Sequence, residues 1–167
     1  IEAAEMSSRP IAITHANPAS WHAARRNKTD AVIGAVTSRG GMLGFSVYPH
    51  HLQGGSDCTL ASFCDMIAET AGKFGAQHLG IGTDLCQDQP DRVVEWMRVG
   101  RWTKQIDYGE GSASDAGFPP MPDWFHDNRD FDRLQSGLRA TGLSDPEVAG
   151  IMGGNWHRFY ADSFGPA

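Results

Sequence analysis

The hydrophobic pattern of this chain switches between short apolar runs and segments with helical spacing. Residues 11–14, 42–48 and 78–84 are apolar, β-branched or glycine-containing runs that predict three short buried strands. Residues 30–38 and the segment after Thr59 place apolar side chains every three or four positions and predict two intervening helices. This order, with short connections, predicts an α/β fold with parallel strands in a βαβαβ arrangement and right-handed crossovers.

Local signals indicate where these helices begin and end. Asn27 or Thr29 is placed to cap the first helix, and Thr59 is placed to cap the second. Gly72 and Gly75 are both expected to end the second helix, because glycine readily adopts the left-handed conformation that follows a helix.

The last third of the chain follows a different pattern. Residues 91–100 predict a short helix, and residues 109–122 form a loop rich in glycine, serine and proline. A further helix is expected from Phe131 to near Gly142. The segment that begins at Ser144 has a capping-box sequence and predicts one final helix that reaches Phe159. No linker divides the chain, so residues 1–167 are treated as a single domain.

Composition excludes several classes of protein. The chain has 167 residues, enough for one domain with a core, and a net charge of -6, which argues against a nucleic-acid partner. No apolar run approaches 18 residues, so no membrane span is expected, and no signal peptide is visible. Three cysteines without C-x-x-C spacing indicate reduced thiols. We therefore expect a cytoplasmic protein.

Chemically capable side chains lie at the end of each predicted strand. His15 follows the first strand, Tyr48 ends the second and Asp84 ends the third. Functional groups in parallel α/β folds gather in the loops at the carboxyl ends of the strands. We therefore expect these three residues at the same end of the sheet.

Each candidate residue has a structural interpretation beside a functional one. His15 could bind a metal, act as a general base or make only a structural hydrogen bond. Asp84 could accept a proton from an attacking water or cap the loop that follows it. Arg26 could bind a substrate carboxylate or face solvent. His51, together with its neighbour His50, could line a pocket, although the pattern favours solvent.

Four motifs in chain order carry a family resemblance. They are THAN at residues 14–17 followed by RRN at 25–27, GGMLGFSVYP at 40–49, GIGTD at 80–84 and GGNWHRF at 153–159. Together they resemble the renal (membrane) dipeptidase family, whose members are zinc-dependent enzymes with an amidohydrolase-like TIM barrel. The resemblance implies that this chain is the C-terminal part of a TIM (β/α)8 barrel, with about strands 6 to 8 and the terminal helices.

The resemblance also implies a function and residue roles. The implied reaction is zinc-dependent hydrolysis of the peptide bond of dipeptides, with two zinc ions per complete barrel. His15 matches a zinc ligand, Arg26 matches the residue that holds the substrate carboxylate, and Asp84 matches the acid–base aspartate. Tyr48 and His51 fall where the family lines its substrate pocket. The four residues after Asp84 depart from the family pattern, which indicates a reshaped pocket.

The remaining zinc ligands of the family precede the matching region. The resemblance therefore implies a partial domain, and we expect the N-terminal half of the barrel as another chain or a missing segment, because three strands alone would expose two sheet edges and a large apolar face. A homodimer is also compatible with this arrangement. Two other interpretations stay open, namely a non-catalytic barrel relative that binds a small molecule or partner, and an unrelated βαβ binding module.

Overall fold

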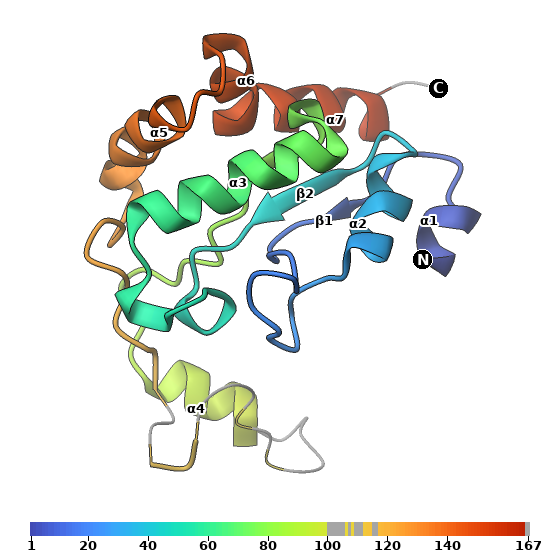
Figure 1. Cartoon of the computed structure of the whole chain (residues 1–167). Coiled ribbons are helices and arrows are strands. Elements are labelled where there is room, and N and C mark those ends of the chain that lie inside the picture. The colour runs from blue at the N-terminus through green and yellow to red at the C-terminus, as the bar shows by residue number, and fades with distance from the viewer. Residues whose placement is uncertain (100–105, 107, 109–111, 115–116, 166–167) are drawn as a thin grey trace.

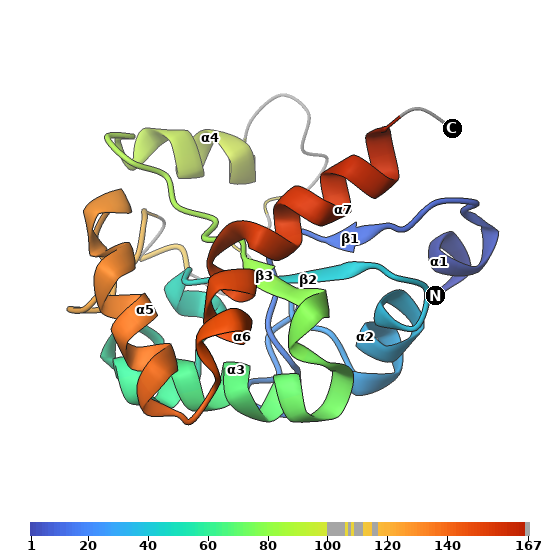
Figure 2. The same ribbon diagram turned by 90° about the horizontal axis from the view of Figure 1, so that it is seen from above.

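The computed structural model describes residues 1–99, 106, 108, 112–114 and 117–165 and contains a parallel three-stranded sheet with helices on both faces (Figures 1 and 2). The strands are β1 (Ala12–Ile13), β2 (Met42–Phe45) and β3 (Leu79–Ile81), in the order β1-β2-β3. Both pairs are parallel, with Ala12 beside Met42 and Leu43 beside Leu79. The predicted α/β class and the βαβαβ order are confirmed.

The helices in the described ranges follow the expected order. They are α1 (Glu2–Met6), α2 (Asp30–Thr37), α3 (Leu60–Phe74), α4 (Arg92–Val99), α5 (Phe131–Ala140), α6 (Asp145–Ala149) and α7 (Asn155–Phe164). Short 3-10 turns are η1 (Pro49–His51), η2 (Gly55–Asp57), η3 (Ala76–His78) and η4 (Asn128–Asp130), and a π turn, η5 (Gly150–Gly154), joins α6 to α7. The short helix expected near residue 91 is confirmed, whereas the expected loop 109–122 lies partly outside the described residues.

Helix α3 shows which end signals were correct. The Thr59 side chain accepts a hydrogen bond from the Ser62 amide over 3.1 Å and caps the helix as predicted. Gly75, at a φ of +88°, ends it. The prediction that Gly72 also ends the helix is wrong, because α3 runs through that position to Phe74. A glycine inside a helix lowers its stability without stopping it when the surrounding turns are packed.

The final helical segment begins as predicted but is broken. Ser144 and Glu147 form the expected capping box at the start of α6. The prediction of one continuous helix to Phe159 is wrong, because Gly153 has non-helical dihedral angles and interrupts the segment at η5. The segment therefore bends before α7, which starts again at Asn155 and runs along the sheet.

The sheet separates two differently packed faces. On one face, Leu43 and Phe45 of β2 and Leu79 of β3 join the core under α3. On the opposite face, β2 and β3 present Gly44 and Gly80, and the Trp156 ring of α7 lies where their side chains would be. Glycine at both positions is required for this close contact.

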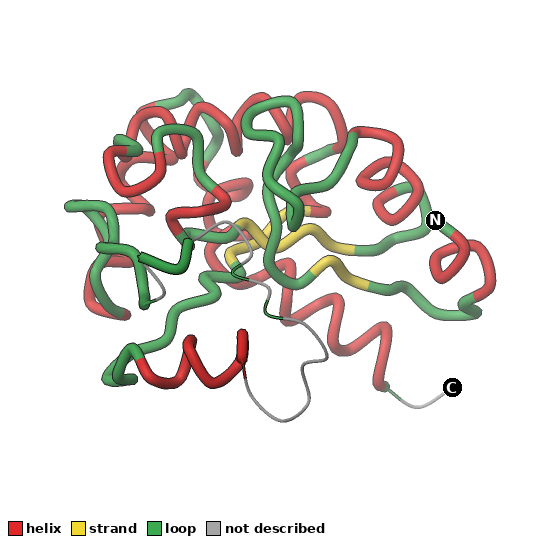
Figure 3. Tube along the Cα trace, turned by 90° about the horizontal axis from the view of Figure 1, so that it is seen from below, coloured by secondary structure: helices red, strands yellow, loops and turns green. Residues whose placement is uncertain are grey.

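This arrangement corrects the expectation of a large exposed apolar sheet face. Every residue of β2 is buried, because α3 and α7 cover its two sides. Among the described residues, the large apolar side chains that are exposed lie mostly on helices: Ile1, Met6, Trp96, Met97, Ile106, Tyr160 and Phe164. In this part of the chain β1 and β3 are the outer strands of the sheet, and the loops that follow all three strands leave from the same end (Figure 3).

Candidate functional site

The loop after β1 closes on itself and holds two of the predicted site residues. The Lys28 amide donates to the Asn17 carbonyl over 2.9 Å, and the Ala19 amide donates to the Lys28 carbonyl over 2.8 Å. Lys28 Nζ also donates to the Arg26 carbonyl. A bridge between Pro18 and Lys28 closes the loop; His15 precedes this bridge and Arg26 lies inside the loop. The two residues therefore lie at the same end of the sheet although they are well separated in the sequence.

Two buried asparagines join this loop to the segment after β2. Asn17 is fully buried, its Nδ2 donates to the carbonyls of Ser46 and His51 over 3.0 and 3.1 Å, and its Oδ1 accepts from the Ser46 amide over 3.1 Å. Asn27 Oδ1 accepts from the Asn17 amide over 2.8 Å, and its Nδ2 donates to the carbonyls of His22 and His51 over 2.8 and 2.9 Å. The sequence analysis named Asn27 only as a possible helix cap, a position that Thr29 occupies, and did not single out Asn17, although each stands inside a motif, RRN or THAN.

His51 is buried among polar groups instead of facing solvent. Its side chain is 6% exposed, and its Nδ1 lies 2.8 Å from Ser46 Oγ. The Tyr48 amide donates to the same Ser46 oxygen over 3.2 Å, and the Tyr48 and His51 rings meet edge to face at 5.1 Å. The solvent interpretation of His51 is therefore wrong, because the η1 turn directs its ring inward.

The environment of His51 keeps its ring neutral. Burial, followed by the positive charges of Arg26 and His15, lowers the pKa of His51 to about 4. A neutral imidazole with one nitrogen facing a hydroxyl can donate or accept a hydrogen bond near neutral pH. Near neutral pH the ring therefore adds no further positive charge beside Arg26 and His15.

This lowered pKa predicts acid sensitivity. The unfolded chain binds a proton on His51 near pH 6.5, whereas the folded chain does so only near pH 4. The neutral His51 ring therefore leaves the free energy of unfolding at its full value above pH 6.5, and this free energy should fall as the pH drops toward 4. The full pKa shift corresponds to about 3 kcal/mol, which solvent screening reduces to about 2 kcal/mol. Urea unfolding between pH 4 and 6.5 should show this decrease in the free energy of unfolding. His51→Gln should make that free energy depend less steeply on pH. The control His126→Gln alters an exposed histidine and should keep the pH dependence of the unaltered protein. An unchanged pH dependence in His51→Gln would show that His51 is not the group responsible.

Asp84 lies in the loop just after β3, which ends at Ile81 and is shorter than the predicted strand 78–84, and it has a left-handed conformation with a φ of +56°. Although the Asp84 side chain is exposed, partial desolvation by its surroundings raises the pKa of the carboxyl, while the charges of His15 and Arg26 oppose that rise. A carboxyl with a raised pKa is better suited to exchange protons near neutral pH. His15 and Arg26 thus act electrostatically on both Asp84 and His51, so the structure brings these four predicted residues together.

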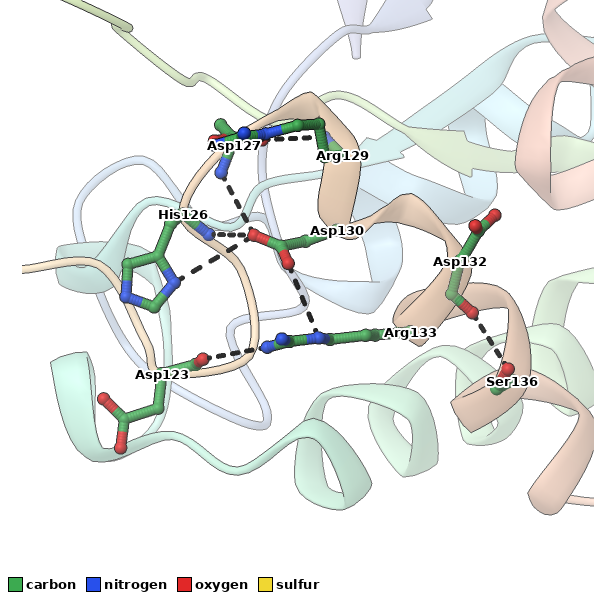
Figure 4. Close-up of polar contacts among 8 residues, drawn as sticks. All are labelled: Asp123, His126, Asp127, Arg129, Asp130, Asp132, Arg133 and Ser136. Atoms are coloured by element: carbon green, nitrogen blue, oxygen red, sulfur yellow. Dashed lines mark hydrogen bonds and ion pairs between the residues drawn. The ribbon is translucent and has the colours of Figure 1, made fainter.

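A cavity of about 240 Å³ lies beside Asp84. Tyr48 and Asp84 line it together with the segment of residues 85–88, which departs from the family pattern, and with His126 and Asp127. Asp130 holds the part of the lining formed by His126 and Asp127 in place, because its carboxylate accepts hydrogen bonds from their backbone amides over 2.8 and 3.3 Å (Figure 4). The 85–88 segment therefore shapes the cavity, and sequence reasoning missed the contribution of His126 and Asp127.

The metal-binding capacity of this chain is partial. His15 is half-buried, and its Nδ1 lies 2.8 Å from Thr14 Oγ1, which leaves Nε2 as the nitrogen to bind a metal. Within the described ranges, no group of three or more His, Cys, Asp or Glu residues could hold a metal ion. His15 can supply one ligand, whereas a zinc site needs at least three from protein. No helix in that part of the chain has the length and apolar character needed to cross a membrane.

A known family matches this chain over more than half of its length. The model of the membrane dipeptidase family, peptidase family M19, matches residues 1–103. This match includes the predicted strands and all five predicted site residues. No curated protein matches the sequence.

Solved structures share the fold over nearly the whole chain. An amidohydrolase from Pseudomonas aeruginosa has a TM-score of 0.87 at 24% identity, over 99% of this chain and 49% of its own. A dipeptidase described as a metallopeptidase of family M19 has a TM-score of 0.73 at 19% identity, over 99% and 41%. A Rhodobacter sphaeroides metallopeptidase, bound to a phosphinate mimic of L-Ala-D-Ala, has a TM-score of 0.70 at 17% identity, over 98% and 39%. The chain spans less than half the length of each.

Proposed function

This chain belongs to the membrane dipeptidase family, peptidase family M19, and we propose from this premise that it is the C-terminal part of a zinc-dependent dipeptidase barrel. In this proposal β1, β2 and β3 are about strands 6 to 8 of a TIM barrel, and residues 1–167 form a single partial domain. The parallel order of the three strands and the coverage of less than half of similar structures support this placement.

The proposal assigns a role to each predicted site residue. Arg26 binds the substrate carboxylate, because its planar guanidinium matches that group and its side chain is exposed. Asp84 accepts the proton of the attacking water and passes it to the leaving amine. Tyr48 and His51 line the substrate pocket. The single observation that supports this best is that His15 and Arg26 act electrostatically on both Asp84 and His51.

His15 would bind one of two zinc ions, and the remaining ligands would come from the N-terminal half of the barrel. When bound, zinc polarises the peptide carbonyl and lowers the pKa of a water molecule. That half would be supplied by another chain or a missing segment, and a homodimer of complete barrels is compatible with this arrangement.

Free cysteines at positions 58, 64 and 86 support our proposal of a cytoplasmic location.

Amino-acid release from dipeptides tests the function. The complete protein that contains this chain, loaded with zinc, should hydrolyse L-Ala-D-Ala or other dipeptides in a panel that varies both side chains, and N-acetylated dipeptides and tripeptides serve as controls. The 167-residue chain alone should be inactive, because it supplies one metal ligand. A complete protein that binds no metal and hydrolyses no dipeptide would instead favour a non-catalytic barrel relative.

A further inference from the structure

Two buried amide side chains connect the segments that carry Arg26 and His51. Asn17 is fully buried and Asn27 is 8% exposed, and both donate through Nδ2 to the His51 carbonyl, over 3.1 and 2.9 Å. Asn27 also accepts from the Asn17 amide over 2.8 Å. One backbone oxygen after β2 is therefore held by two side chains from the loop after β1, and these side chains also contact each other.

This network fixes Arg26 through its neighbour in sequence. Asn27 follows Arg26 directly, and its three hydrogen bonds determine where the backbone at this point lies relative to η1. The Arg26 side chain itself is exposed, so its own packing contributes little to its position. Together with the contacts of Lys28 to the Asn17 and Arg26 carbonyls, the Asn27 amide therefore holds the backbone from which the Arg26 side chain projects.

We propose that Asn17 and Asn27 are positioning residues that set Arg26 at the distance at which it binds the substrate carboxylate. This inference rests on the proposed dipeptidase function. A purely structural role would also explain why polar side chains at these positions are buried and fully hydrogen-bonded. The two roles differ in their effect on substrates with and without a carboxylate, because only positioning acts through Arg26.

The experiment compares two substrates in variants of the complete protein. Asn27→Ala should raise KM for L-Ala-D-Ala, or for the best dipeptide found, about 10-fold or more, with kcat changed less than about 3-fold. The same variant should change kcat/KM for the C-terminal amide of that dipeptide less than about 3-fold. In an Arg26→Gln background, Asn27→Ala should have no further effect on the dipeptide, because its route of action has been removed.

Asn155 offers a matched control. It is equally buried, at 5% exposed, and its Nδ2 donates to the carbonyls of Ala76 and Leu79 over 2.8 Å each, at the opposite end of β3 from Asp84. Asn155→Ala should lower the melting temperature and leave both substrates within about 2-fold. If Asn27→Ala does not fold, Asn27→Ser keeps a small neutral side chain whose hydroxyl can both donate and accept a hydrogen bond, and the same KM pattern is expected.

Equal losses on the two substrates would overturn the positioning role, and so would an undiminished effect of Asn27→Ala in the Arg26→Gln background. An active unaltered protein with either result refutes this inference alone. An unaltered protein without dipeptide hydrolysis refutes the proposed function and this role together.

Discussion

Replacing Asp84 by asparagine is expected to lower kcat for dipeptide hydrolysis by a factor of about 10² to 10⁴, the range typical of a lost general acid–base. Asparagine has the same shape but cannot accept and return a proton. The backbone should tolerate the change, because Asp84 has a φ of +56° and asparagine adopts this left-handed conformation readily. Steady-state kinetics of the complete protein would measure the loss.

A nearby aspartate provides the control for this prediction. Asp88 also has a positive φ, +54°, and borders the same cavity, but the acid–base role is assigned to Asp84, on whose carboxyl the charges of His15 and Arg26 act. Asp88→Asn should therefore change kcat less than about 10-fold, whereas Asp84→Asn should exceed this by at least another factor of ten. Equal effects of the two substitutions would remove the special role of Asp84.

Replacing Gly82 by alanine is expected to destabilise the protein by about 3 kcal/mol or more. An added Cβ would lie 1.7 Å from the Thr14 carbonyl oxygen, and this atom belongs to the backbone, which cannot turn away as a side chain can. The close approach also matters for the site, because Thr14 precedes His15 and Gly82 stands two residues before Asp84. Chemical unfolding would measure the stability.

Gly72→Ala is the control for this substitution. Gly72 is exposed within α3, and an added Cβ would meet nothing within 4 Å. This change should stabilise the protein by about 0.5–1 kcal/mol, because alanine loses less backbone entropy than glycine in a helix. A tolerated Gly82→Ala, with stability near that of Gly72→Ala, would contradict the packing described for this end of the sheet.

The parallel strands and their helices could be predicted because their signals are local. Apolar runs, the Thr59 cap and the Ser144–Glu147 capping box act within a few residues, so the sequence shows them directly. The break at Gly153 could not be predicted in the same way, because glycine inside a helical pattern is compatible with both a continuous and a broken helix.

Some features of the candidate site could likewise be predicted from the sequence, and others could not. His15, Tyr48 and Asp84 were predicted from their positions at strand ends, whereas the family resemblance favoured the functional over the solvent interpretation of Arg26 and His51. The burial of His51 depends on contacts with Ser46 and on loops far apart in sequence, as do the roles of Asn17 and Asn27. Such tertiary hydrogen bonds leave no periodic pattern, so the sequence favoured solvent for a side chain that is enclosed.

The most direct test of the central claim is the zinc content of the complete protein. We expect two zinc ions per barrel in the unaltered protein. In His15→Ala we expect the loss of at least one, with dipeptide hydrolysis falling in parallel, and thermal melting of the purified variant should show that it is folded. A His15→Ala protein that retains two zinc ions and full hydrolysis would contradict the claim that this chain supplies part of a zinc dipeptidase site.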